Sequence, residues 1–362
     1  MNFEFKQNPI SIKTAIIAAF LGTFVGFLMV AFFGYNPFKV FRTLFLGAFG
    51  SRKALASSLR WATPLMFTGV AAALAFKGGM FNFGMDGQLY IGSLAATIVA
   101  LYGGALPGWL LISLMILVSM LFGALWAFIP AFVKVKLERS EIVPALMLNY
   151  VAIHLTDFLV HYFFLAKGTS GDSLKTDRIA VQAQLTNIVK GYQLTWAILL
   201  GLIVVFAFWI LLKKTKLGYK ITLSGENPEF SRYGGITVQR VRVFVMLLSG
   251  ALAGLCGAVE IMSVRWRFES QFAPTLGNDG IISALLGSST PVGTLIASLF
   301  MGALKAGSLS VERYTEVSRA LTTIIQGIIM CFISSRFIVP HFNEKKKATK
   351  GVKRIKTEGR EI

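Results

Sequence analysis

Long apolar runs dominate the chain, and most are long enough to cross a bilayer as a helix. A transmembrane helix needs about 20 predominantly apolar residues, because the hydrocarbon core is about 30 Å thick. We expect spans at 14–34, 63–77, 86–103, 108–133, 142–165, 194–212, 243–263, 291–308 and 318–338. The pattern predicts an all-α polytopic membrane protein.

A further apolar piece, 280–288, is too short to cross alone. Pro291 separates it from the next run, so we expect a half-helix or a re-entrant hairpin there. With this piece the transmembrane domain, 14–340, has about eight to ten membrane elements. The remaining segments are an N-terminus, 1–13, and a basic tail, 341–362.

Two Gly-Xaa-Asp-Gly turns, 84–87 and 277–280, interrupt the apolar pattern in corresponding parts of the two halves. Broken helices with polar tips in matching halves are typical of transporters built from inverted repeats. We therefore expect two related, inverted halves, with the two turns on opposite sides of the bilayer midplane.

Polar side chains at these turns are the main candidates for a substrate pathway. Asn82, Asp86, Gln88 and Asp279 lie there. A carboxylate at membrane depth costs at least about 2.5 kcal/mol and tends to face a cavity. The alternative is structural, because a carboxylate also accepts backbone N–H groups at a helix start.

Two further polar residues lie inside predicted spans. Asn149 is placed to hydrogen-bond a solute hydroxyl or base edge, or to join two helices by an amide bond. Glu260 closes a run of small residues, and we expect it to serve in substrate binding or in a gate. His154, Asp157 and His161 share one helical face, which suggests a proton relay or metal site; a structural role is the alternative.

The basic residues set the expected sidedness. The chain has a formal net charge of +19, yet only 15% of its residues are charged and 55% are hydrophobic. The positive charge gathers in the loop 213–242 and in the tail, which indicates cytoplasmic segments and anionic lipid, not nucleic acid. The alternation of spans places 35–61 outside, although this segment carries five basic residues and no acid; its helical spacing of apolar residues predicts an amphipathic surface helix.

The loop 213–242 has the turn chemistry of a short, doubly capped helix. Asn227 is the expected N-cap, Pro228 the first helical residue, and Gly234-Gly235 the end. Such a helix can move as a rigid body, so we expect it to couple to an ATPase subunit. The residues assigned to this role are Gly225, Asn227, Pro228, Glu229, Arg232, Gly234 and Gly235.

Several kinds of chemistry lack a motif in this sequence. There is no Gly-Xaa4-Gly-Lys-Ser/Thr phosphate loop, so ATP hydrolysis is expected on another chain. We predict no metal site and no cofactor, and we interpret Cys256 and Cys331 as packing residues. The aromatic residues Trp266 and Phe268, flanked by arginines, are expected to anchor the membrane interface; an aromatic lid over a base is the alternative.

Four ordered segments carry a family resemblance: 81–88, 141–150, 218–235 and 249–260. Together they resemble permeases of ATP-binding cassette (ABC) importers, in the ribose and nucleoside branch of the group that includes branched-chain amino acid permeases. The resemblance implies a multi-pass inner-membrane subunit, and the basic tail, which lies beyond the matched region, predicts a cytoplasmic C-terminus. The resemblance also implies three partners: a second, related permease, a cytoplasmic ABC ATPase, and an external solute-binding protein or lipoprotein.

The predicted function is therefore import of a small hydroxylated solute, with a purine nucleoside first. Ribose or another simple sugar and riboflavin remain alternatives, because all combine hydroxyls with a compact ring. Two other classes stay open: an ion-coupled secondary transporter, and an intramembrane aspartyl enzyme in which Asp86 and Asp279 converge as a dyad.

Overall fold

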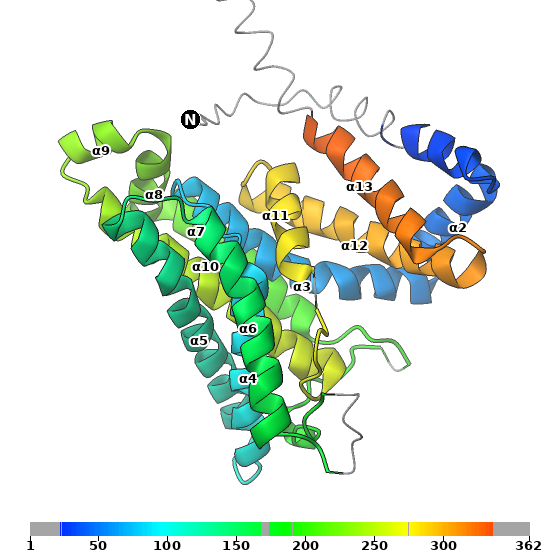
Figure 1. Cartoon of the computed structure of the whole chain (residues 1–362), viewed down its shortest axis with the longest axis horizontal. Helices are drawn as coiled ribbons and strands as arrows, with labels where there is room; N and C mark the ends of the chain where they lie inside the picture. The colour runs from blue at the N-terminus through cyan, green and yellow to red at the C-terminus, as the bar shows by residue number, and fades with distance from the viewer. Residues whose placement is uncertain (1–21, 23, 168–173, 190, 274, 336–362) are drawn as a thin grey trace, which may run out of the picture. The chain divides into compact units, whose positions relative to one another are not determined.

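The computed structural model describes residues 22, 24–167, 174–189, 191–273 and 275–335. These residues fall into two compact units, one formed by 48–306 and the other by 22–47 with 307–335 (Figure 1). Both units are helical. In the described ranges the extended pairings are two isolated bridges, Lys175 with Glu269 and Asn187 with Thr195. The predicted all-α class is confirmed.

Helices follow one another along almost the whole described chain. They are α2 Pro37–Phe49, α3 Arg52–Lys77, α4 Met85–Tyr102, α5 Gly108–Lys136, α6 Ile142–Phe163, η1 Val181–Ala183, α7 Ala197–Lys214, α8 Lys216–Glu226, α9 Pro228–Tyr233, α10 Val238–Glu260, the π-helix η2 Ile261–Arg265, α11 Leu276–Leu286, α12 Pro291–Tyr314 and α13 Arg319–Ser335.

Six helical stretches in the described part are long and apolar enough to cross a membrane: α3, α5, α6, α7, 238–265 and α12. The predicted half-helix corresponds to α11, and the run 86–103 to α4. The runs 14–34 and 318–338 are described only in part, as a helix around 22–32 and as α13. The segments 1–13 and 341–362 lie outside the described residues. The inverted relation between the halves stays a prediction.

The second predicted span starts too late. Helix α3 begins at Arg52, not near residue 63, so 52–61 belongs to a transmembrane helix and not to a loop. Ser51 caps the start, because its hydroxyl accepts a hydrogen bond from the Ala54 N–H at 3.1 Å. The charged residues of this first part made the helix look shorter than it is.

The segment 213–242 is more helical than expected. Besides the predicted short helix, it contains α8, whose start is capped by Thr215 through the Gly218 N–H at 3.0 Å. Gly218 and Gly225, in the segment expected to be a loop, both lie in this helix. Gly225 permits close approach: a side chain there would collide with the Lys77 carbonyl at the end of α3.

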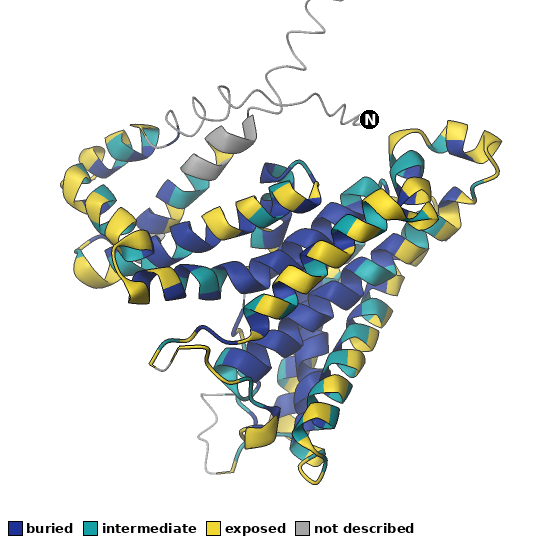
Figure 2. Cartoon of the chain, turned by 180° about the vertical axis from the view of Figure 1, so that it is seen from behind, coloured by how far each residue is buried: buried dark blue, intermediate teal, exposed yellow. Residues whose placement is uncertain are grey.

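The core of the 48–306 unit forms where α10 packs against α3, α4 and α5. Helices α3 and α10 are almost wholly buried, whereas α5, α6 and α7 expose much of their surface (Figure 2). Gly254 allows the closest crossing, since a Cβ there would meet the Ser119 carbonyl of α5. Small residues bring backbones together in this way where apolar burial alone gives little specificity in lipid.

The other unit contains α2, which is amphipathic as expected. Phe38 and Phe45 are exposed on it, while Val40 is buried. Gly307 of α12 lies against the Leu44 carbonyl, so the backbones of the two helices are close. The placement of α2 along the outer membrane surface stays a prediction.

Candidate functional site

Asn82 and Gln88 form a closed amide pair at the turn between α3 and α4. The Asn82 amide N–H groups donate to Gln88 Oε1 and Ser249 Oγ, both at 2.8 Å, and Gln88 Nε2 donates back to Asn82 Oδ1 at 2.9 Å. Ser249 in turn donates to the Ala71 carbonyl. Both amides are buried, so these bonds join α3, α4 and α10. Direct contact with solute stays a prediction for Asn82 and Gln88.

Asp86 joins the two Gly-Xaa-Asp-Gly turns. Its Oδ1 accepts a hydrogen bond from the Gly277 N–H at 2.7 Å, at the start of α11. This bond supports the structural role considered for Asp86, in which its carboxylate accepts backbone N–H groups at a helix start. The helix that it caps is α11, not its own helix α4. Gly277 is required here, because a Cβ would lie 2.6 Å from the Asp86 backbone nitrogen. The two motifs lie at the starts of α4 and α11 and are in contact; their placement on opposite sides of the bilayer midplane stays a prediction.

Asn149 ties α6 to the first turn. Its side-chain oxygen accepts from the Gly87 N–H, and its Nδ2 donates to the Phe83 carbonyl, each at 2.8 Å. These are the bonds expected of an amide that joins two helices. They use both ends of the amide group, so a role in solute contact stays a prediction.

Asp279 has a different environment from Asp86. Its Oδ2 pairs with Lys305 Nζ at 2.6 Å and accepts from the Thr275 hydroxyl at 3.3 Å, and both charged side chains are partly exposed. Each aspartate is thus bonded to its own partners. The arrangement offers no carboxyl–carboxyl hydrogen bond of the kind that a catalytic dyad shares.

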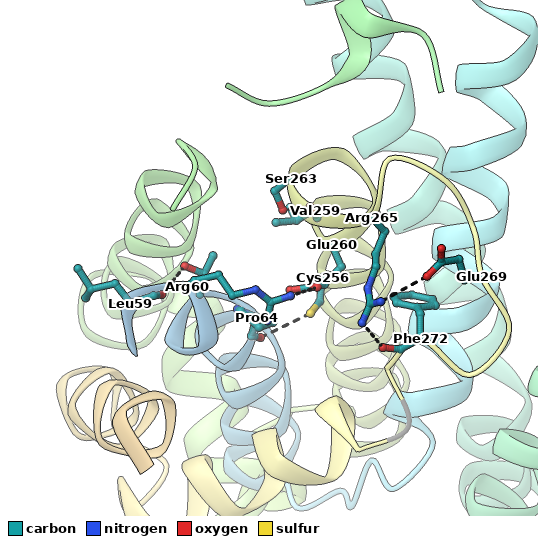
Figure 3. A network of polar contacts seen from close by, with 11 residues as sticks. Leu59, Arg60, Pro64, Cys256, Val259, Glu260, Ser263, Arg265, Glu269 and Phe272 are labelled. Atoms are coloured by element: carbon teal, nitrogen blue, oxygen red, sulfur yellow. Dashed lines mark hydrogen bonds and ion pairs between the residues drawn. The ribbon is translucent and has the colours of Figure 1, made fainter. Parts of the chain in front are cut away.

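Glu260 forms a buried ion pair with Arg60, which the sequence interpretation had not assigned (Figure 3). Arg60 Nη2 lies 2.9 Å from Glu260 Oε2, and the guanidinium lies 3.9 Å from the centre of the Trp61 ring. The Arg60 atoms Nε and Nη1 are buried without a hydrogen-bond partner among the described residues. The signals in the sequence were an arginine shortly before the predicted span 63–77 and the only acidic residue of the predicted span 243–263.

The backbone is irregular on both sides of this pair. Pro64 lies inside α3, four residues after Arg60, and cannot donate the helical hydrogen bond to the Arg60 carbonyl. On the other side, α10 changes into the π-helix η2 directly after Glu260. Proline kinks and π-helical turns bend helices and recur at functional sites. The pair therefore links two deformable points.

The predicted coupling helix is present as α9. Asn227 Oδ1 accepts from the Phe230 N–H at 2.9 Å, Pro228 is the first residue, and Glu229 lies in the first turn. The helix ends at Gly234, and Gly235 follows with a φ of 74°, which favours glycine. Phe230 and Tyr233 are exposed on its surface. The capping prediction is correct; the contact with an ATPase stays a prediction.

Glu141 is a second residue that sequence reasoning left without a role. It is buried, its Oε1 accepts from the Phe81 N–H, and its Oε2 pairs with Lys134, each at 3.0 Å. The carboxylate thus ties the end of α5 to the loop that enters α4. A lone glutamate directly before the apolar run of α6 was the available signal.

One aromatic prediction is wrong. Phe268 is fully buried and packs against Tyr90 and Phe272, with ring centres 6.2 and 5.7 Å away, so it does not anchor a lipid interface. Glu269 accepts from both flanking arginines, Arg265 and Arg267. Intramolecular packing therefore replaces the interfacial role expected from the aromatic and basic alternation.

Comparison with known proteins identifies the relatives of this chain. Residues 54–334 match the family model described as "Branched-chain amino acid transport system / permease component". A nucleoside ABC transporter permease protein of Lactococcus lactis subsp. cremoris is 30% identical, covering 95% of this chain and 96% of that protein. A guanosine ABC transporter permease protein of Bacillus subtilis is 31% identical over 90% and 93%. A glucose ABC transporter permease protein of Haloferax volcanii is 33% identical over 93% of each.

Proposed function

We propose that this chain, which belongs to the branched-chain amino acid transport system permease component family, moves a purine nucleoside across the cytoplasmic membrane. Family membership makes it a multi-pass permease subunit of an ABC transporter, a transport chain and not an enzyme. The observation that supports the nucleoside is the similarity to nucleoside and guanosine permeases along nearly the whole length. A simple sugar is the second candidate, because the glucose permease is equally similar.

The complete importer would contain this chain, a second related permease, a cytoplasmic ABC ATPase and an external solute-binding protein. In this proposal the C-terminus and α9 lie on the cytoplasmic side. The exposed side chains Phe230 and Tyr233 of α9 would enter a groove of the ATPase. Capping at both ends supports this role, because it lets the short helix move as one body.

The hydrogen bonds suggest how motion of α9 would travel into the membrane. A short turn connects α9 to α10, which carries both Ser249 and Glu260. Ser249 contacts Asn82 at the broken helix, and Glu260 holds Arg60 of α3. A displacement of α10 would therefore reach α3 and α4 together, as rocking of a permease around a central pathway requires.

Uptake measurements test the solute. Cells with the complete transporter, with and without this chain, are given labelled guanosine and challenged with unlabelled nucleosides, ribose, glucose or riboflavin. We expect saturable uptake that needs this chain and is blocked only by nucleosides. Unchanged guanosine uptake without the chain would contradict the proposal, and competition by a sugar would move the sugar ahead.

Pull-down of the ATPase tests the coupling helix separately. We expect a double change, Phe230→Ala with Tyr233→Ala, to reduce ATPase retention and uptake together. Val181→Ala is the matched control, because Val181 is an equally exposed apolar residue on η1, far from α9 in sequence. Normal ATPase retention in the double variant, or in a deletion of 226–233, would refute this contact.

A further inference from the structure

Helix α6 has two opposite faces with different chemistry. One face is buried against the rest of the unit and includes Asn149 and Thr156. The opposite face is exposed and mixed: apolar residues such as Val143, Met147 and Val151 lie beside Tyr150, His154, Phe158 and His161, and we call the last four the α6 stripe. Their spacing of four, four and three residues keeps them on one side of the helix. Within the part of the chain that the structure describes, the two imidazoles and the Tyr150 hydroxyl make no hydrogen bond.

The neighbouring spans do not share this chemistry. On α7 the large exposed side chains are Leu199, Leu202, Ile203, Phe206 and Ile210, all apolar. On α5 the large exposed side chains are also apolar or, near the outer start, Trp109. Such faces suit lipid. The α6 stripe, with its two histidines, therefore differs from two other exposed surfaces of the same unit.

Lipid is a poor environment for the α6 stripe. His154 lies near the middle of the 22-residue helix, nine residues before its last residue, which is roughly 14 Å at 1.5 Å per residue. At that depth hydrocarbon offers no partner for an imidazole N–H or a hydroxyl. Ionisable residues inside membrane spans almost always face a cavity or another protein group. Asp157 lies at the edge of the stripe and is half-buried, and its Oδ1 is buried without a hydrogen-bond partner among the described residues.

We propose that the α6 stripe is the solute-contacting wall of the translocation pathway, and that His154 is a specificity-determining residue in it. This inference rests on the proposed nucleoside function. Tyr150 and Phe158 offer rings on which a base can stack. His154 and His161 offer a donor and an acceptor each for ribose hydroxyls or base edges. A nucleoside combines both kinds of surface, and weak contacts of this type let it pass without being trapped.

The buried side of α6 gives the wall a rigid support. Asn149 bonds to Phe83 and Gly87 at the broken-helix turn. Rocking of that turn would therefore carry the α6 stripe with it. The stripe thus changes its exposure with the same motion that reorients the pathway.

Cysteine accessibility in the complete transporter tests this wall. The parent is a Cys331→Ala variant that keeps Cys256, because Cys331 is exposed and Cys256 is buried. His154→Cys is compared with Ile203→Cys on the apolar face of α7, using a charged, membrane-impermeant methanethiosulfonate reagent. We expect at least tenfold faster labelling at position 154 than at position 203, and at least fivefold slowing of that labelling by guanosine. Tyr150→Cys serves as a second probe if His154→Cys does not reach the membrane.

The outcomes separate this inference from the proposed function. If ribose or glucose slows labelling at position 154 and guanosine does not, the α6 stripe contacts solute but the solute is not a nucleoside. If neither position 150 nor position 154 is labelled while guanosine uptake is intact, the α6 stripe does not line the pathway, although the solute is still a nucleoside. The exposed face of α6 would then contact the second permease or lipid. Labelling that no solute slows also overturns solute contact.

Kinetics give a second readout for His154. We expect His154→Ala to raise the KM for guanosine about tenfold while the maximal rate changes less than twofold, since the side chain binds solute and does not carry the structure. His154→Gln should recover much of the affinity, because an amide also offers a donor and an acceptor. Equal loss of maximal rate in both variants, with KM unchanged, would contradict the assignment.

Discussion

Asp86 and Asp279 occupy the same place in the same four-residue motif, yet the fold uses them differently. Asp86 is buried and accepts the Gly277 N–H, so it holds the two broken helices together. Asp279 is partly exposed and pairs with Lys305. The motif alone therefore does not define the role of its carboxylate. The neighbouring backbone and the degree of burial decide it.

Among the carboxylates of this unit, we expect removal of Glu260 to destabilise the protein most, because its carboxylate is buried and paired with a full positive charge. Removing it by Glu260→Ala leaves Arg60 uncompensated, and breaking such a pair typically costs about 3–5 kcal/mol of unfolding free energy. We expect little folded protein in the membrane. Quantifying folded, detergent-extracted protein by size exclusion and thermal melting checks this.

A double variant sharpens the Glu260 test. Replacing both partners, Arg60→Met with Glu260→Leu, removes both buried charges and should restore folding, because apolar residues of similar size often replace a buried pair well. Transport should nevertheless remain impaired if the pair works as a gate. A well-folded Glu260→Ala protein would show that the pair contributes little.

The first glycines of the two motifs should respond unequally to the same change. At Gly277 an added Cβ would lie 2.6 Å from the Asp86 backbone nitrogen, whereas at Gly84 the nearest atom is a side-chain atom, Gln88 Nε2, at 3.1 Å. We expect Gly277→Ala to cost about 3 kcal/mol, the upper part of the range for overpacking, and Gly84→Ala clearly less. Thermal melting of the two variants gives the comparison. Equal melting temperatures of Gly277→Ala and Gly84→Ala would contradict the expected difference between the two glycines.

Asp86 should show the cost of an unpaired backbone group. Asp86→Ala leaves the buried Gly277 N–H without its acceptor, which we expect to cost about 2 kcal/mol. Asp86→Asn keeps a side-chain oxygen and should fold nearly normally. Melting and guanosine uptake are measured on both variants.

The two Asp86 variants separate a structural role from a pathway role. If the carboxylate only caps α11, Asp86→Asn transports normally. If transport fails in a well-folded Asp86→Asn protein, the negative charge itself acts on the solute pathway. Normal folding of Asp86→Ala would contradict the capping role.

Asp279 should give the smallest effect. Its pair with Lys305 is less buried than the Arg60–Glu260 pair, with side chains 17–21% exposed against 4–7%, so its loss should cost less. We therefore expect Asp279→Ala, Lys305→Ala and the double variant to melt within a few degrees of the parent. A coupling energy of several kcal/mol in this double-mutant cycle would make the two carboxylates equivalent after all.

Local features of this fold were accessible from the sequence, and long-range ones were not. The capped helix α9 follows from Asn227, Pro228 and Gly234, because capping depends on residues a few positions apart. The partners of Asp86 and Arg60 lie 191 and 200 positions away, so no local pattern could identify them. The start of α3 was missed for the same reason: Arg60 argues against a span unless Glu260 is known to neutralise it.

The opposed faces of α6 have a consequence for how such a permease can diversify. Asn149 and its bonds to the turn lie on one face, and His154 lies on the other. Substitutions on the outward face therefore need not disturb the joint between the broken helices. A library of variants confined to positions 150, 154, 158 and 161 could change which solute is transported while keeping the bonds of Asn149 and the coupling to the ATPase. Both evolution and engineering could then alter solute selectivity without altering the energy-coupling parts of the permease.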